Sequence, residues 1–162
     1  MIESIRVDDR LIHGQVALVW SKEFNINRIV VANDAAASNE VQQMTLKMAT
    51  PSGIKLLIKP VAEAIEVFNN PKAKNVGLFV LTNTIGDALE IVKNCPDIKG
   101  VNVANVGRFD NTPNKKSLNH SLLLNDDELA CAKELVKFDI PIFHQIIPSD
   151  QPVSLKKLLQ KF

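Results

Sequence analysis

The sequence predicts an α/β domain, in which an open, mostly parallel sheet carries helices on both faces and a short antiparallel hairpin lies near the C-terminal third. Apolar runs of about five residues alternate with segments whose apolar residues recur at helical spacing. The apolar runs are nearly continuous, which is typical of strands buried on both faces. With 162 residues, 46% of them hydrophobic, we expect a single domain over residues 1–162.

Six runs rich in Val, Ile, Leu or Phe are predicted to be strands. They span residues 2–7, 28–32, 54–58, 76–81, 99–103 and 140–146.

Each gap between the second and the fifth of these strands contains one segment with apolar residues at the spacing i, i+3, i+4, i+7. This spacing predicts helices that face the sheet. The three stripes are Val41, Met44, Thr45 and Met48; Val61, Ala64, Ile65 and Phe68; and Ile85, Ala88, Leu89 and Val92.

The alternation breaks after residue 106. Turn-forming residues over 107–114 precede a predicted hairpin over 116–124. A helix should begin at Asn125, whose side chain can cap free N–H groups, with three acidic residues in its positive first turn. A closing helix is predicted after Pro152, and we expect its apolar residues to dock the chain end. These are Leu155, Leu158, Leu159 and Phe162.

Composition excludes several classes of function. The 19 basic and 18 acidic residues give a net charge of +1, so no basic surface for nucleic acid is expected. Cys95 and Cys131 do not form a CxxC pair, which favours a reducing compartment and a role as small packing residues. There is no leader pattern and no apolar segment of membrane-spanning length, so we expect a cytoplasmic protein that meets a membrane only through a partner.

The richest chemistry lies in residues 6–16, Arg-Val-Asp-Asp-Arg-Leu-Ile-His-Gly-Gln-Val, where the first strand ends and a helix begins. In open α/β sheets ligands bind beyond the carboxyl ends of the strands, and a helix N-terminus offers free N–H groups to an anion. His13 should lie at that position. An imidazole has a free pKa of about 6.5 and a ring nitrogen with a lone pair, so it is a competent nucleophile toward phosphorus near neutral pH.

The residues around this histidine are of the types that hold a phosphoryl group. Arg6, Asp8 and Arg10 should project to one side of an extended backbone, and guanidinium groups grip phosphate oxygens well. Asp8 or Asp9 would orient an arginine or align the ring, and Gly14 would permit close backbone approach. Residue types alone also fit a hydrogen-bonded surface histidine beside ordinary surface ion pairs.

The whole eleven-residue string, followed by Trp20, closely resembles the opening motif of the IIB components of the mannose, fructose and sorbose family of bacterial phosphoenolpyruvate-dependent sugar phosphotransferase systems. The resemblance covers essentially the full chain. It extends through residues 65–71 (Ile-Glu-Val-Phe-Asn-Asn-Pro), 82–83 (Thr-Asn), 100–103 (Gly-Val-Asn-Val) and 158–159 (Leu-Leu).

The resemblance implies a phosphocarrier that takes a phosphoryl group from the phosphohistidine of a IIA partner and passes it to a sugar entering through the membrane components IIC and IID. It implies that His13 carries the group on Nδ1, that Arg6 and Arg10 assist, and that no cofactor is required. The protein would be cytoplasmic and peripherally associated with the transporter. The alternative is a regulatory or phosphate-binding module on the same scaffold. Mannose, fructose, sorbose and amino sugars all stay open as substrates, as do the cognate IIA and a homodimer.

Four further residues receive weaker interpretations. The Thr82 hydroxyl would either bind a phosphate oxygen or cap its strand end. Residues 103–108 depart from the more glycine-rich turn expected of the family, and Arg108 there would either meet a partner or be solvated. His120 and His144 have no neighbours at ligand spacing, so no metal site is predicted.

Two further features argue against other sites. Trp20 has helical spacing to its apolar neighbours, which favours a packing role rather than a sugar platform. No glycine-rich nucleotide loop is present, so ATP and NAD are not indicated.

Overall fold

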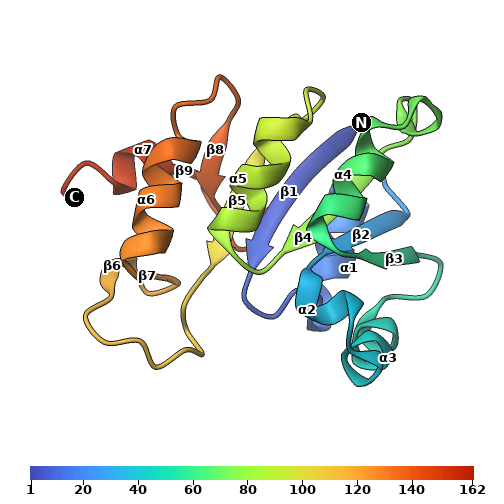
Figure 1. Ribbon diagram of the computed structural model, residues 1–162, viewed down its shortest axis with the longest axis horizontal. Coiled ribbons are helices and arrows are strands. Elements are labelled where there is room, and N and C mark those ends of the chain that lie inside the picture. Colours follow the sequence, from blue (N-terminus) through green and yellow to red (C-terminus); the bar gives the residue numbers. More distant parts are fainter.

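A seven-stranded sheet runs through the middle of the computed structural model, which describes residues 1–162 (Figure 1). The strand order is β3-β2-β4-β1-β5-β8-β9, and all neighbours are parallel except β8 and β9. The strands are β1 (Ile2–Asp8), β2 (Arg28–Ala32), β3 (Lys55–Lys59), β4 (Leu78–Thr82), β5 (Val101–Asn105), β8 (Ile142–His144) and β9 (Val153–Ser154). The predicted fold class is therefore confirmed, and each expected strand is present with its ends moved by at most two residues. The two-residue strand β9 was not predicted.

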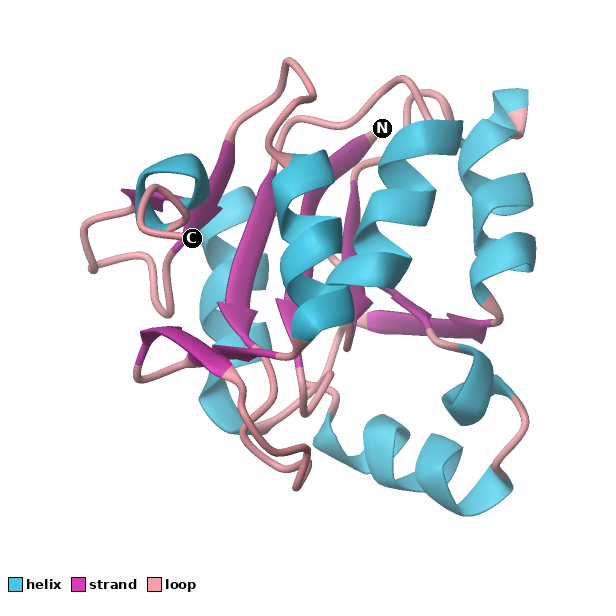
Figure 2. Ribbon diagram, turned by 60° about the vertical axis from the view of Figure 1, so that its left-hand side comes forward, coloured by secondary structure: helices cyan, strands magenta, loops and turns pink.

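Helices cover both faces of this sheet, as Figure 2 shows. They are α1 (Gly14–Phe24), α2 (Asp34–Ala37), α3 (Glu40–Ala49), α4 (Val61–Asn69), α5 (Ile85–Asn94), α6 (Asp126–Leu135) and α7 (Leu155–Leu158), with one short 3₁₀ turn η1 (Pro71–Ala73). Helices α4, α5 and α6 lie in front of the sheet in Figure 1, and α1 lies behind it. None of the helices is both long and apolar enough to cross a membrane.

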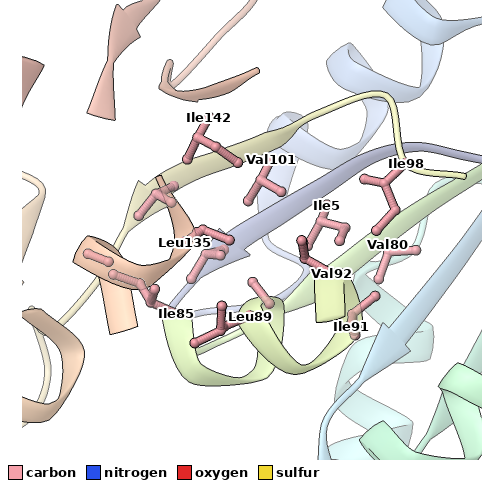
Figure 3. Close-up of a cluster of buried hydrophobic side chains, with 14 of the residues drawn as sticks. Ile5, Val80, Ile85, Leu89, Ile91, Val92, Ile98, Val101, Leu135 and Ile142 are labelled. Carbon is pink, nitrogen blue, oxygen red and sulfur yellow. The ribbon is translucent and has the colours of Figure 1, made fainter. Parts of the chain in front are cut away.

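The larger core lies between the sheet and α5. Figure 3 shows Leu89 and Val92 of α5 close to Ile5, Val80 and Val101 of three neighbouring strands. This arrangement confirms the predicted stripe of α5, and the stripe of α4 is likewise in contact with this core. A smaller core on the opposite face joins α1 to β2 and β4.

The C-terminal third contains the predicted hairpin, formed by β6 (Lys116–Asn119) and β7 (Leu122–Leu124). Val106, just after β5, is bridged to Leu122, so the hairpin is attached at the carboxyl end of the sheet. Asn125 caps α6 by accepting a hydrogen bond from the Glu128 N–H at 2.8 Å, as expected. Leu155 and Leu159 are buried and Leu158 is half-buried, which confirms that the chain end is docked, but the prediction is wrong for Phe162, which lies beyond the end of α7 and is exposed.

The prediction for the stripe of α3 is wrong. Val41, Met44 and Met48 are 74, 64 and 85% exposed, and Thr45 is exposed as well, whereas Leu46 is the buried residue of this helix. α3 packs beside α2, with the Gln43 amide donating to two α2 carbonyls at 3.0 Å, and it does not lie flat on the sheet. Helical spacing shows that apolar residues share one face of a helix, but it does not show whether that face packs against the sheet.

Candidate active site

The loop between β1 and α1 carries His13 at the carboxyl end of the central strand. Leu11 adopts a left-handed conformation with φ of 61°, and its N–H donates to the Asp8 carbonyl at 2.9 Å. Leu11 and Ile12 are both buried in the smaller core, and this packing fixes the position of the loop. His13 follows as the extended N-cap residue of α1, with its side chain 24% exposed. Gly14 has φ of 48°, a conformation that favours glycine, and open space surrounds the position of a Cβ.

The Asp8 carboxylate is the centre of the polar network around this loop, and the residue is fully buried. Its Oδ2 lies 3.1 Å from His13 Nε2 and accepts from Asn105 Nδ2 at 3.0 Å and from Arg6 at 3.3 and 3.4 Å. Its Oδ1 accepts the Arg10 backbone N–H at 3.1 Å. Burial alone would raise the pKa of Asp8, but the Arg6 charge and these hydrogen bonds outweigh it and hold the pKa below its ordinary value. The carboxylate is therefore ionised at neutral pH.

An ionised carboxylate can only accept a hydrogen bond, so its contact with His13 requires a proton on Nε2. The neutral ring then carries its lone pair on Nδ1. No hydrogen bond within the protein involves Nδ1. The geometry therefore favours Nδ1 as the nucleophilic atom.

Arg6 lies beneath Asp8 instead of opening toward solvent. It is 1% exposed, its Nη1 donates to the Gln145 carbonyl at 3.3 Å, and its guanidinium lies 5.8 Å from the centre of the Trp20 ring. Burial lowers the pKa of Arg6, while the charge of Asp8 acts in the opposite direction. Trp20 is buried and donates to the Ile146 carbonyl at 2.9 Å, which confirms its predicted packing role.

Two other arginines flank the loop at the surface. Arg10 is exposed, has no carboxylate partner, and lies 5.1 Å from the ring of Phe109. Arg108 lies 5.2 Å from the same ring and binds Asp9 through two side-chain hydrogen bonds of 2.7 and 3.1 Å. The hydrogen bond with Asp9 raises the pKa of Arg108. The expected row of Arg6, Asp8 and Arg10 is thus realised only for its first two members, because the strand ends at Asp8 and the chain turns.

Thr82 and the remaining histidines are outside this network. Thr82 ends β4 beside Val7, and its buried hydroxyl donates to the Thr84 carbonyl at 3.3 Å. His144 Nδ1 lies 2.8 Å from the Val103 carbonyl, and His120 is exposed in the hairpin. No three side chains of the His, Cys, Asp or Glu types come together as metal ligands.

Sequence reasoning missed three contacts of the site, including the pairing of Arg108 with Asp9, since Arg108 was expected either to meet a partner or to be solvated. Asn105 binds Asp8, which is 97 residues away in the sequence, and the Gln145 carbonyl accepts from Arg6, which is 139 residues away. Arg108 binds Asp9, which is 99 residues away. Local patterns carry no signal for such contacts, since they depend on which strand ends lie next to β1.

A histidine with a ring nitrogen left free, beside an ionised carboxylate and arginines at the end of a central strand, has the groups that phosphoryl transfer can use, and this arrangement favours a phosphotransferase. The family model of the phosphotransferase system (PTS) sorbose subfamily IIB component matches residues 2–162, and the chain belongs to this family. It is a sugar phosphotransferase component with a phosphotransfer role in sugar uptake.

Individual relatives agree over nearly their whole length. A probable phosphotransferase enzyme IIB component of Streptococcus pyogenes serotype M6 is 53% identical over 162 residues, covering 98% of this chain and 99% of the relative. A sorbose-specific EIIB component of Klebsiella pneumoniae is 34% identical over 152 residues, which is 93% of this chain and 90% of the relative. The crystal structure of the IIBSor domain of the sorbose permease from Klebsiella pneumoniae superposes with a TM-score of 0.90 at 30% identity, over 99% of this chain and 97% of that one.

Proposed function

We propose that His13 is the phosphocarrier residue and that its Nδ1 takes a phosphoryl group from the phosphohistidine of a IIA partner. The contact of 3.1 Å between Asp8 Oδ2 and His13 Nε2 is the observation that carries this proposal, because it leaves Nδ1 as the free nucleophile. We also propose that residues 1–162 act as one domain, in line with the family match over 2–162.

In the proposed step the Nδ1 lone pair forms a bond to phosphorus. The phosphorus–nitrogen bond of the donor breaks, and its electron pair returns to the donor ring. The His13 ring then carries a phosphoryl group on Nδ1 and a proton on Nε2, so it is cationic. Asp8 stabilises that cation, and the cationic ring remains a good leaving group for the second transfer, to the sugar.

The other residues of the site have supporting roles in this proposal. Arg10, which has no carboxylate partner, is free to grip the phosphoryl oxygens with its guanidinium group. Arg6 acts through Asp8, whose negative charge it compensates. Gly14 allows the left-handed backbone that begins α1. The proposal gives Thr82 no direct contact with phosphate, since its hydroxyl is bonded at the strand end.

The partners proposed are a IIA donor and the membrane components IIC and IID, which receive the sugar. The mannose-specific EIIAB component of Escherichia coli is matched over 47% of its length, which leaves room in that chain for a IIA part. We propose that partners dock over the end of β1 and that the protein is cytoplasmic and meets the membrane through IIC and IID. Two histidines must come within contact distance for the group to pass directly between them.

The test is the intact mass after incubation with phosphoenolpyruvate, the general phosphotransferase proteins and a cognate IIA, followed by phosphorus NMR. We expect the gain of one acid-labile phosphoryl group, lost in His13→Ala and kept in His120→Ala, which removes an exposed histidine of the hairpin. A phosphoryl group retained by His13→Ala would refute the assignment. No gain with several IIA donors would favour the phosphate-binding module.

A further inference from the structure

The pairing of β1 with β5 contains one irregularity, and it lies at the active site. Val7 is opposite Val103, but the next residue, Asp8, is opposite Asn105. Ala104 is therefore an extra residue on β5, which makes the pair bulged at this point. Bulges beside active sites re-aim side chains that regular pairing would direct elsewhere.

The bulge changes the face on which the Asn105 amide lies. In regular alternation Asn105 would share the face of Val101 and Val103, which belong to the larger core on the α5 side. Asn102 lies between Val101 and Val103 in the sequence and therefore points to the other face. There its amide donates to the Gln145 carbonyl at 2.8 Å and accepts from the Gln145 N–H at 3.0 Å, beside Arg6. With the extra residue, the amide of Asn105 reaches Asp8 on that other face.

The contact that results is short and shielded from water. Asn105 is 4% exposed, and its Nδ2 lies 3.0 Å from Asp8 Oδ2, nearer than either Arg6 nitrogen. Without Asn105, the Arg10 N–H would hold Oδ1, and Oδ2 would have only the longer hydrogen bonds from Arg6 besides its contact with His13. A donor on a second strand restricts the rotation of the carboxylate about its Cβ–Cγ bond and keeps Oδ2 aligned with His13 Nε2.

We propose that Asn105 is a positioning residue for phosphoryl transfer, which acts by holding Asp8 so that the proton of His13 stays on Nε2 and Nδ1 stays free. This inference rests on the proposed function of His13. No hydrogen bond joins Asn105 to the His13 ring, and the effect of Asn105 passes through one carboxylate oxygen.

The test compares Asn105→Ala with Asn33→Ala, since Asn33 is equally buried and bonded but contacts neither Asp8 nor His13. Ring nitrogen-15 NMR of His13 should show the Nε2–H form in the unchanged protein and in Asn33→Ala, and a mixture of both tautomers in Asn105→Ala. The kcat for phosphoryl acceptance should fall about tenfold or more in Asn105→Ala alone, with an unchanged KM for phosphorylated IIA.

Asn105→Leu keeps most of the side-chain volume and removes the amide donor without adding a charge beside Asp8, so it should give the same spectral change even if Asn105→Ala folds poorly. Unaltered ring nitrogen shifts in both Asn105 variants, with kcat no lower than in Asn33→Ala, would overturn the proposal. If the unchanged protein accepts no phosphoryl group, the proposed function of His13 fails, whereas the nitrogen spectra still decide the part of Asn105.

Discussion

Replacing Asp8 by asparagine should destabilise the protein, because it leaves the Arg6 guanidinium buried without a compensating charge. Arg6 is 1% and Asp8 0% exposed, and their side chains are joined by hydrogen bonds of 3.3 and 3.4 Å. Removing one partner of a buried ion pair costs about 3–5 kcal/mol. We expect Asp8→Asn to lower the free energy of unfolding at neutral pH by that amount.

Urea denaturation followed by the fluorescence of Trp20, the single tryptophan, measures this change. The pKa of Asp8 is lowered in the folded protein, so the carboxylate stabilises the fold above its unfolded pKa of about 3.9. That stabilisation is lost as the pH falls through the lower folded pKa. The difference between the parent and Asp8→Asn should therefore be constant from neutral pH to about pH 4 and should shrink at lower pH.

The double variant Arg6→Met/Asp8→Asn is the control, because it removes both charges and keeps most of the volume. It should recover part of the stability lost in Asp8→Asn. A cost below about 1 kcal/mol for Asp8→Asn would show that the pair behaves like a solvated surface pair and would refute the reasoning. A double variant no more stable than Asp8→Asn alone would refute it as well.

Three further variants test other parts of the structure. Arg10→Ala should slow phosphoryl acceptance about tenfold or more while leaving the melting temperature unchanged, and an unaltered rate would remove Arg10 from the site. Phe109→Ala should raise the KM for phosphorylated IIA, because Phe109 is 62% exposed between two guanidinium groups beside the site. Phe162→Ala, which removes an exposed ring under Lys161, is its control, and equal KM values for the two variants would contradict docking at Phe109. Met48→Gln should change the free energy of unfolding by less than about 0.5 kcal/mol, as urea denaturation can verify, whereas a loss of about 2 kcal/mol or more would mean that this side chain is covered.

The fold was largely predictable because its main signals are local. The apolar runs that became β2 and β4 are buried almost throughout, so their composition identifies them. The cap at Asn125 is also local, since it depends on one side chain and an N–H three residues later. α3 shows the limit of local signals, because its apolar stripe lies beyond the surface that the sheet offers.

The candidate site was predictable only in part. The string 6–16 gives the position of His13 at a strand end, and alternation along the strand correctly puts Arg6 and Asp8 on one face. The burial of Arg6 could not be inferred, because Trp20 and Gln145 cover it from elsewhere in the chain. The register shift that brings Asn105 to Asp8 is a property of two paired strands, and neither strand shows it in its own sequence.

The central place of β1 bears on how the site behaves over time. β1 is hydrogen-bonded on both sides, to β4 and to β5, and is covered on both faces. Amide protons in such a strand exchange with solvent mainly through global unfolding, whereas loops and edge strands open locally. The strand that supports His13 should thus be among the slowest-exchanging parts of the molecule. Because Asp8 ends this strand, the loop that carries His13 is attached at one end to the most rigid part of the molecule.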